Sequence, residues 1–331
     1  MKKLMVTILT LFLASALIGC SFDSLEGYKD AVEKTEQIQK GRTEGEFSLE
    51  MDFNTEGMTE EQIKELNYFR KMKGSFNAAY DHELGKKIFR YYLNFGGLGF
   101  DLDLFVNGEE MFMKLPVIGK YAKLSKMKEY MTDTQEEDFG FVDQGTQNAI
   151  DEKWLGLLKK EDIFKGKDTI LTTPDGEVKV TEYTIRLNDN QIKDLAMYSI
   201  DMLSKDERFN ESYEKYIKKN FESLKDTSPK ELLSDMKENI KKYTVESFGY
   251  TAYVDIDGYI VSEIVGITLE VDNAEPTAVT GLSYELNIKN WDINKAQEFD
   301  FPELTDENTI DIDNIDQNMP FDIEVLFNDE N

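Results

Sequence analysis

The chain has 331 residues, of which 40% are hydrophobic and 12% aromatic, so it carries enough apolar side chains to fold around a sizeable core. Its 66 acidic and 38 basic residues give a formal net charge of −28 at pH 7. This charge argues against a nucleic-acid partner, whose phosphates require Lys and Arg, and against a body that lies flat on an anionic membrane. Solubility is a simpler explanation of the acidity than an acid-specific partner.

The first twenty residues have the pattern of a targeting segment. Lys2 and Lys3 give a positive start, Leu4 to Ile18 is an uncharged apolar run, and Cys20, the only cysteine, follows Gly19. This segment resembles a bacterial lipoprotein signal peptide with its lipobox. The resemblance implies cleavage before Cys20, a diacylglyceryl thioether on Cys20, and a protein anchored by lipid to the extracytoplasmic face of the cell membrane.

Two alternatives to this interpretation are less favoured. A membrane-spanning helix needs ~20 apolar residues, and this run is shorter. An ordinary secretory signal would make the position of Cys20 incidental. With residues 1–19 as the signal, 20–305 are expected to form a single domain with a helical block at 189–243, and 306–331 an acidic C-terminal tail. A mature chain whose one thiol is acylated has no disulfide, so its stability must come from its core.

The mature chain is predicted to begin with a helix. Apolar residues recur at spacings of three and four from Asp23, and Gly41 is expected to close the helix. Because the helix follows Cys20 closely, the body should sit near the membrane. In Glu46 to Asn54 apolar and polar residues alternate, as in a strand with one buried face. Further strands are expected at 74–80, 87–94, 99–106, 110–115 and 121–124, with a helix at 58–72 that Thr59 caps.

The rest of the chain has a second group of strands after the central helices. Asn107-Gly108 predicts a type I′ hairpin in the first group, and Asp257-Gly258 predicts a hairpin in the second. The two groups are possible halves of one sheet. Residues 292–331 are expected to be an irregular covering segment or a frayed tail. The elements expected between them are an acidic loop at 132–143, helices at 148–158 and within 189–243, and strands at 177–187, 248–255, 259–271 and 278–291.

Several hairpin segments prompt a family comparison. The stretches 105–116, 120–123, 180–195 and 253–260, in this element order, resemble the lipoprotein-localisation fold of LolA and LolB and of the mycobacterial LppX and LprG lipoproteins. The resemblance implies an α+β fold in which a large, curved antiparallel sheet, a half-barrel, wraps helices and encloses an apolar cavity for acyl chains. It assigns no functional residue other than Cys20.

The sequence offers little catalytic chemistry. His82 is the only histidine, which excludes Ser-His-Asp and multi-histidine metal sites within this chain. Gly96-Gly97-Leu98-Gly99 lies between two strands and is interpreted as a turn instead of a phosphate-binding loop. His82 itself is expected to be an exposed loop residue. We therefore expect no enzyme activity, no cofactor and no metal.

Two acidic motifs resemble parts of calcium loops. Asp255-x-Asp257-Gly258 is better explained as a hairpin turn, because the position two residues earlier is Tyr253 and strands flank the motif. Asp311-x-Asp313 lacks the required glycine, and it is interpreted as a solvated tail in which weak Ca²⁺ binding stays open. Carboxylate pairs for a glycosidase need a ~5 to 10 Å separation, which sequence cannot show.

The strongest functional signal is a set of apolar strand residues. Packing against helices as ordinary core is the simpler explanation for each of them. The sharper hypothesis is that part of this core stays open for a lipid or another apolar ligand, with methionines as adaptable lining. The competing hypothesis is a cell-surface interaction protein with a collapsed cavity, which charged residues on the inward strand faces would favour. The ligand-facing candidates are Phe47, Leu49, Met51, Phe53, Phe89, Tyr91, Leu93, Met111 and Met113.

Overall fold

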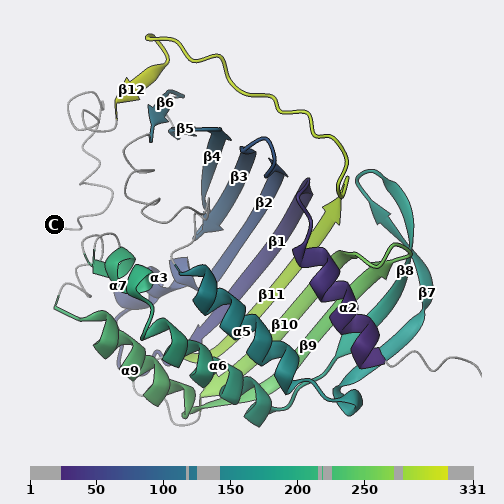
Figure 1. Ribbon diagram of the computed structural model, residues 1–331. Helices are drawn as coiled ribbons and strands as arrows, with labels where there is room; N and C mark the ends of the chain where they lie inside the picture. Colours follow the sequence, from purple (N-terminus) through teal and green to yellow (C-terminus); the bar gives the residue numbers. More distant parts are fainter. Residues whose placement is uncertain are drawn as a thin grey trace, which may run out of the picture.

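A single sheet of twelve strands dominates the part of the chain that the computed structural model describes, namely residues 24–116, 119–124, 142–214, 218, 226–271 and 279–311. Cys20 and the predicted signal segment lie outside these residues, as does all of the predicted loop 132–143 except its last two residues. The fold is α+β, with an open, mostly antiparallel sheet and helices against one of its faces (Figure 1). The strands are β1 (Lys40–Phe53), β2 (Lys71–Asp81), β3 (Lys86–Phe95), β4 (Leu98–Asn107), β5 (Glu110–Lys114), β6 (Tyr121–Lys123), β7 (Ile163–Thr173), β8 (Gly176–Ile185), β9 (Tyr243–Asp255), β10 (Ile260–Val271), β11 (Val279–Trp291) and β12 (Thr309–Asp311).

The two groups of strands are halves of one sheet, as the sequence suggested. The strand order is β12-β6-β5-β4-β3-β2-β1-β11-β10-β9-β8-β7. The halves meet where β1 pairs with β11, in an antiparallel register that runs from Arg42 opposite Trp291 to Phe53 opposite Val279. Among the described strands, only the short β12 pairs in parallel, with β6. The central helices therefore interrupt the sequence of the sheet and leave its hydrogen bonding continuous.

Six helices are described in addition to the sheet. Their N-caps follow local chemistry: Thr59, the predicted cap, and Ser228 each form a capping box, and Pro229 occupies the first turn of α9. Asp206, which is buried, accepts hydrogen bonds from the backbone N–H groups of Asp143 and Phe209 and so links the starts of α5 and α7. The helices are α2 (Ser24–Glu36), α3 (Glu60–Phe69), α5 (Gln144–Leu157), α6 (Asp189–Leu203), α7 (Glu207–Ser212) and α9 (Pro229–Ile240).

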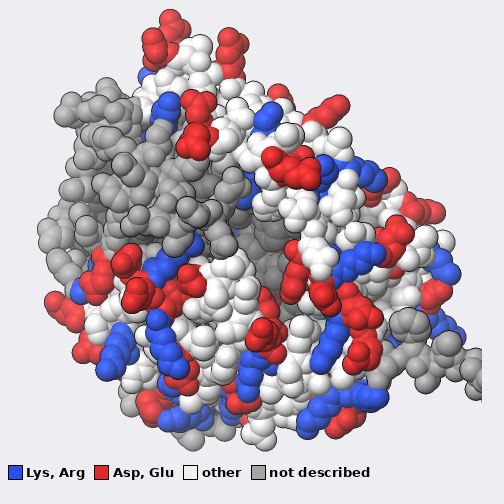
Figure 2. Space-filling model, in the orientation of Figure 1, with Lys and Arg blue, Asp and Glu red and all other residues white. Residues whose placement is uncertain are grey.

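The main core lies between the sheet and helices α2 and α5. Tyr28 of α2 is 1% exposed and packs with Tyr183, Ile185 and Tyr250 of β8 and β9. We call this side of the sheet the helix-side face and the opposite side the outer face. Ion pairs such as Lys153–Asp194, at 2.7 Å between α5 and α6, join neighbouring helices on the surface. On the face seen in Figure 2 acidic side chains are interspersed with Lys and Arg.

Residues after β11 form a covering segment on the other side of the sheet. Phe299, Phe301 and Leu304 pack on Ile88, Phe105 and Phe112, which lie on the outer face of β3, β4 and β5. In Figure 1 this segment crosses the upper end of the sheet between β11 and β12. The interpretation of this region as an irregular covering segment is confirmed for residues 292–308, and Thr309–Asp311 adds a strand that was not predicted.

The turn between β3 and β4 agrees with the prediction from sequence, whereas the type of the turn between β4 and β5 does not. The hairpin between β4 and β5 exists, but its central residues are Gly108 and Glu109, and among them only Gly108 has a positive φ, of 60°. This is the pattern of a type II′ turn, so the predicted type I′ turn with Asn107 as a central residue is wrong. Gly96 and Gly97, with φ of 58° and 85°, form the turn between β3 and β4.

Two further expectations are corrected by the structure. Gly41 lies inside β1 and does not close the first helix, which ends at Glu36. Strand β7 was not predicted, because its sequence has the charged stretch Lys165 to Asp168 at its centre, where the pairing with β8 is irregular. A run with this little apolar alternation is recognised as a strand only through its partner β8.

Glycines at the centre of the sheet make room for aromatic rings on the helix-side face. Gly45 pairs with Phe76, and Gly74 pairs with Phe47, across the β1–β2 ladder. A Cβ on Gly45 would lie 2.3 Å from Cζ of Phe76, and one on Gly74 would lie 2.4 Å from Phe47. Each phenylalanine therefore lies over the glycine opposite it.

We expect Gly45→Ala to lower the free energy of unfolding by about 1–3 kcal/mol, because the Phe76 ring must leave a packed position. The matched control is Gly249→Ala in β9, where an added Cβ has nothing within 4 Å. Urea unfolding of both variants measures the difference. Equal effects of the two substitutions would contradict this packing.

Candidate functional site

All nine predicted ligand-facing residues within the sheet lie on the helix-side face. Directly paired residues of neighbouring strands point to the same side of a sheet. Tyr91 of β3 pairs with Phe76 of β2 and Leu102 of β4, and Phe76 pairs with Gly45 of β1. The same register carries the face to β5 through the pair Leu104–Met113. Alternating residues from β1, β3 and β5 are thus collected on one surface.

The nine residues differ in how they are packed. Met111 is 2% exposed and belongs to a closed cluster with Val106 and Ala122, so for this residue the ordinary-core interpretation holds. Tyr91 is 42% exposed. The remaining seven are half-buried, namely Phe47, Leu49, Met51, Phe53, Phe89, Leu93 and Met113.

An exposed apolar surface surrounds Tyr91. On β4, Phe100 and Leu102 are 42% and 38% exposed, and they lie on the same face. Ring pairs connect these strands: Phe76 and Tyr91 have centroids 6.3 Å apart, and Phe95 stacks on Phe100 at 5.2 Å. We call the set of Phe76, Phe89, Tyr91, Leu93, Phe100 and Leu102 the aromatic face. Phe76, Phe100 and Leu102 are not among the ligand-facing residues predicted from the sequence.

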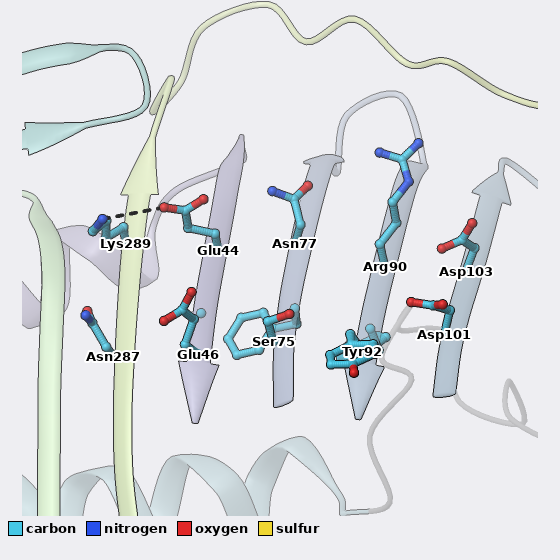
Figure 3. A pocket seen from close by; sticks show the side chains of 13 residues that line it. Glu44, Glu46, Ser75, Asn77, Arg90, Tyr92, Asp101, Asp103, Asn287 and Lys289 are labelled. Atoms are coloured by element: carbon cyan, nitrogen blue, oxygen red, sulfur yellow. Dashed lines mark ion pairs between the residues drawn. The ribbon is translucent and has the colours of Figure 1, made fainter. Parts of the chain in front are cut away.

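The charged residues of the same strands gather on the outer face. They line a pocket of about 400 Å³ over β11, β1, β2, β3 and β4. Figure 3 views this pocket from the side opposite to Figure 1, with the labelled polar side chains projecting from the strands. Lys289 and Glu44 form its ion pair, at 3.6 Å. Its other polar lining residues are Glu46, Ser75, Asn77, Arg90, Tyr92, Asp101, Asp103 and Asn287.

The strand pairing shows which residues of each strand face the helices, which the sequence alone did not assign. In β1 to β4 most of the inward, helix-side positions are apolar and the carboxylates point outward, but β3 carries one buried charge on the helix side, Lys87, which pairs with Tyr80 and Val106. Charged inward faces would have favoured the interaction-protein hypothesis. A carboxylate on the inward side does occur in β10, where Glu263 pairs with Ala252 and Ile288.

Glu263 lines a second cavity, of about 310 Å³, between the sheet and helices α2 and α5. A hydrogen-bonded chain of aromatic residues forms part of its wall. Trp154 Nε1 donates to the Tyr28 hydroxyl at 3.3 Å, and the Tyr250 hydroxyl donates to Glu263 Oε1. The rings of Tyr28 and Tyr250 meet edge to face at 5.9 Å. The remaining lining residues are Val32, Thr35, Glu36, Asp151, Leu155 and Ile260.

Burial raises the pKa of several ionisable side chains that line this cavity. It raises the pKa of Glu263 more than the hydrogen bond from Tyr250 lowers it. It also raises the pKa of Tyr28 to about 12 and that of Tyr250 further. Glu36, at the exposed end of α2, has a raised pKa because of partial burial and then the nearby carboxylates of Asp151 and Glu33.

A cavity between sheet and helices therefore exists, but its lining is not the predicted one. None of the nine candidates contributes to it. It is formed by helix residues and by strands from the other half of the sheet. The signal in the sequence was Glu263, a charge within the apolar strand Tyr259 to Val271 that has no alternation to explain it.

The remaining sequence candidates behave as turns. His82 is exposed in the connection between β2 and β3. Asp255 and Asp257 lie in the hairpin between β9 and β10, where Asp255 accepts from the backbone N–H of Tyr259 at 2.8 Å. In the described part of the chain, no three His, Cys, Asp or Glu residues are arranged to hold a metal ion. Asp313, of the second acidic motif, lies outside the described residues.

Comparison with known proteins adds a distant structural match. No protein-family model and no curated protein matches the chain. A crystal structure of a beta-barrel-like protein, a domain of unknown function (DUF1849) from Brucella abortus, matches with 8% identity and a TM-score of 0.20. The match covers 77% of this chain and 100% of that one. A score this low supports no inference about fold or function. Among the helices of the described residues, none combines the length and apolar character that crossing a membrane requires.

We expect the half-buried Glu263 to make the free energy of unfolding fall as pH rises. Its pKa is raised in the folded protein, so the folded state loses stability from the usual carboxyl range up to the raised value. Glu263→Gln should remove this loss, and it should stabilise the protein more at pH 8 than at pH 5. The control is Glu270→Gln, on the exposed part of the same strand. Urea unfolding across this pH range that gives both variants the same pH dependence would contradict the expectation.

Proposed function

We propose that this protein is a lipid-anchored extracytoplasmic binding protein that holds an acyl chain against its aromatic face. The observation that carries the proposal is the exposure of Tyr91, Phe100 and Leu102 on one face, in register with half-buried Phe47 and Leu93. Each CH₂ of a chain removed from water there would contribute about 0.8 kcal/mol. The proposal includes no catalytic step.

The expected anchor supports the choice of a lipid. Cys20 is four residues before Ser24, where α2 begins, and four extended residues span at most about 14 Å. Helix α2 packs on the helix-side face through Tyr28. A lipid on Cys20 would therefore hold this side of the sheet close to the membrane, where acyl chains are available.

The proposal retains the finer part of the family resemblance. In the lipoprotein-localisation fold a curved half-barrel and its helices enclose acyl chains. Here α2 and α5 pack on β8, β9 and β10, and the aromatic face lies on β2, β3 and β4 of the same side of the sheet. We infer that the ligand occupies this other half, beside the helices.

A second candidate function has its own observation. The polar pocket on the outer face favours a polar or protein partner for a cell-surface interaction protein. The binding experiment below separates the two candidates, because β3 presents one tyrosine to each face.

We expect Tyr91→Asn to weaken fatty-acid or phospholipid binding by about tenfold, because it places an amide in the apolar contact. The matched control is Tyr92→Asn, since Tyr92 is 40% exposed on the outer face of the same strand. Native mass spectrometry of residues 21–331, before and after organic extraction and after adding lipid, measures the bound fraction. Loss of binding in Tyr92→Asn alone would move the ligand to the polar pocket, and no lipid binding by the wild type would refute the proposal.

The anchor is tested separately by Cys20→Ser. Metabolic labelling with palmitate should mark the wild-type protein, and the variant should fall to background because it lacks the thiol that accepts the diacylglyceryl group. Label retained by the variant would refute lipidation at this position.

A further inference from the structure

We propose that the cavity between α2, α5 and strands β9 and β10 binds a small organic cation with an ammonium group, which Glu263 and the rings of Trp154 and Tyr250 hold. This site is separate from the aromatic face, and it does not depend on binding there. It is carried by the charge, the walls and the size of the cavity.

The charge of the cavity has one sign. Glu36, Asp151 and Glu263 come from three different elements and face the same volume, and its lining contains no Lys or Arg. No Lys or Arg of the described ranges forms an ion pair with any of the three. Asp151 accepts hydrogen bonds from the neutral Gln147 side chain at 3.2 Å. Low-dielectric walls strengthen the attraction of such a cavity for a cation.

The lysines next to the lining residues are engaged elsewhere. Lys34 of α2 lies over the ring of Tyr259, 4.6 Å from its centroid. Lys153 of α5 pairs with Asp194 at 2.7 Å. These contacts leave the negative charge of the cavity without an internal counter-ion in the described part of the protein. Burial raises the pKa of Glu263 and of Glu36, and no cationic side chain is among the groups that shift either pKa.

The walls select an organic cation over a metal ion. Trp154 packs against Tyr250 with centroids 5.7 Å apart, and aromatic ring faces attract ammonium groups within about 6 Å. Val32, Leu155 and Ile260 offer apolar contact for carbon substituents. The volume of about 310 Å³ corresponds to about ten water molecules. The carboxylates surround this volume, and no three of them are arranged as metal ligands in the described residues.

The three carboxylates also lie at different depths, from the protein surface to the sheet. Glu36 is exposed and Asp151 half-exposed on the helices, whereas Glu263 lies on the sheet beneath them and accepts the Tyr250 hydroxyl. A cation would meet the outer carboxylates first and then reach the inner one. A cationic partner would offset part of the cost of holding the inner carboxylate away from water.

The test compares choline with its neutral isostere 3,3-dimethyl-1-butanol by isothermal titration calorimetry on residues 21–331. Choline or the smaller ethanolamine should bind saturably, and the isostere should bind at least about tenfold more weakly. Glu263→Gln should weaken choline about tenfold or more, and the control Glu270→Gln should not. Equal binding of choline and its isostere, failure of both amines to bind, or unchanged binding in Glu263→Gln would overturn the proposal.

Three further features make the outcome of this test unambiguous. The ligand comparison uses the wild-type protein, so it holds even if Glu263→Gln fails to fold. Dihexanoyl phosphatidylcholine below its micelle concentration distinguishes two sources of the same chemistry. Competition with choline would identify a lipid headgroup, and its absence would identify a free cation. Tyr91→Asn should leave choline binding unchanged, which separates this site from the aromatic face.

Discussion

The pairing of β1 with β11 is the constraint on which the rest of the structure depends. It joins strands from the two ends of the chain, and it fixes which side of each strand faces the helices. Because side chains alternate with a period of two, a shift of one residue would bring Glu44 and Glu46 to the helix side and turn Phe47 outward. The glycine–phenylalanine pairs of β1 and β2 oppose such a shift, since only glycine leaves room for the rings of Phe47 and Phe76.

From this register follow three surfaces of different chemistry. Helices α2 and α5 close one half of the helix-side face over Tyr250 and Ile185. The other half presents aromatic residues around Tyr91, and the outer face of the same strands presents a polar pocket. The inward carboxylate Glu263 lies where the helices close over the sheet, so its cavity is both enclosed and acidic. One topology thus places an apolar surface and an acidic cavity on the same side of the sheet.

Much of this arrangement was predictable where the physics is local. The sequence identified three residues of the aromatic face, Phe89, Tyr91 and Leu93 of β3, and the capping residue Thr59 marked the start of α3. Features that depend on distant pairing were not predictable: β7 is a strand because β8 pairs with it. The cavity at Glu263 requires α2, α5 and β10 to meet, and no local pattern encodes that meeting.

The most direct test of the apolar-ligand proposal is photocrosslinking with a phospholipid that carries a diazirine on its acyl chain, followed by mass spectrometry of the labelled peptides. The account predicts adducts on the helix-side residues of β3 and β4, with Tyr91 and Leu102 among them. Adducts confined to the outer-face residues around Arg90 and Asp103, or no adduct on the sheet, would contradict it.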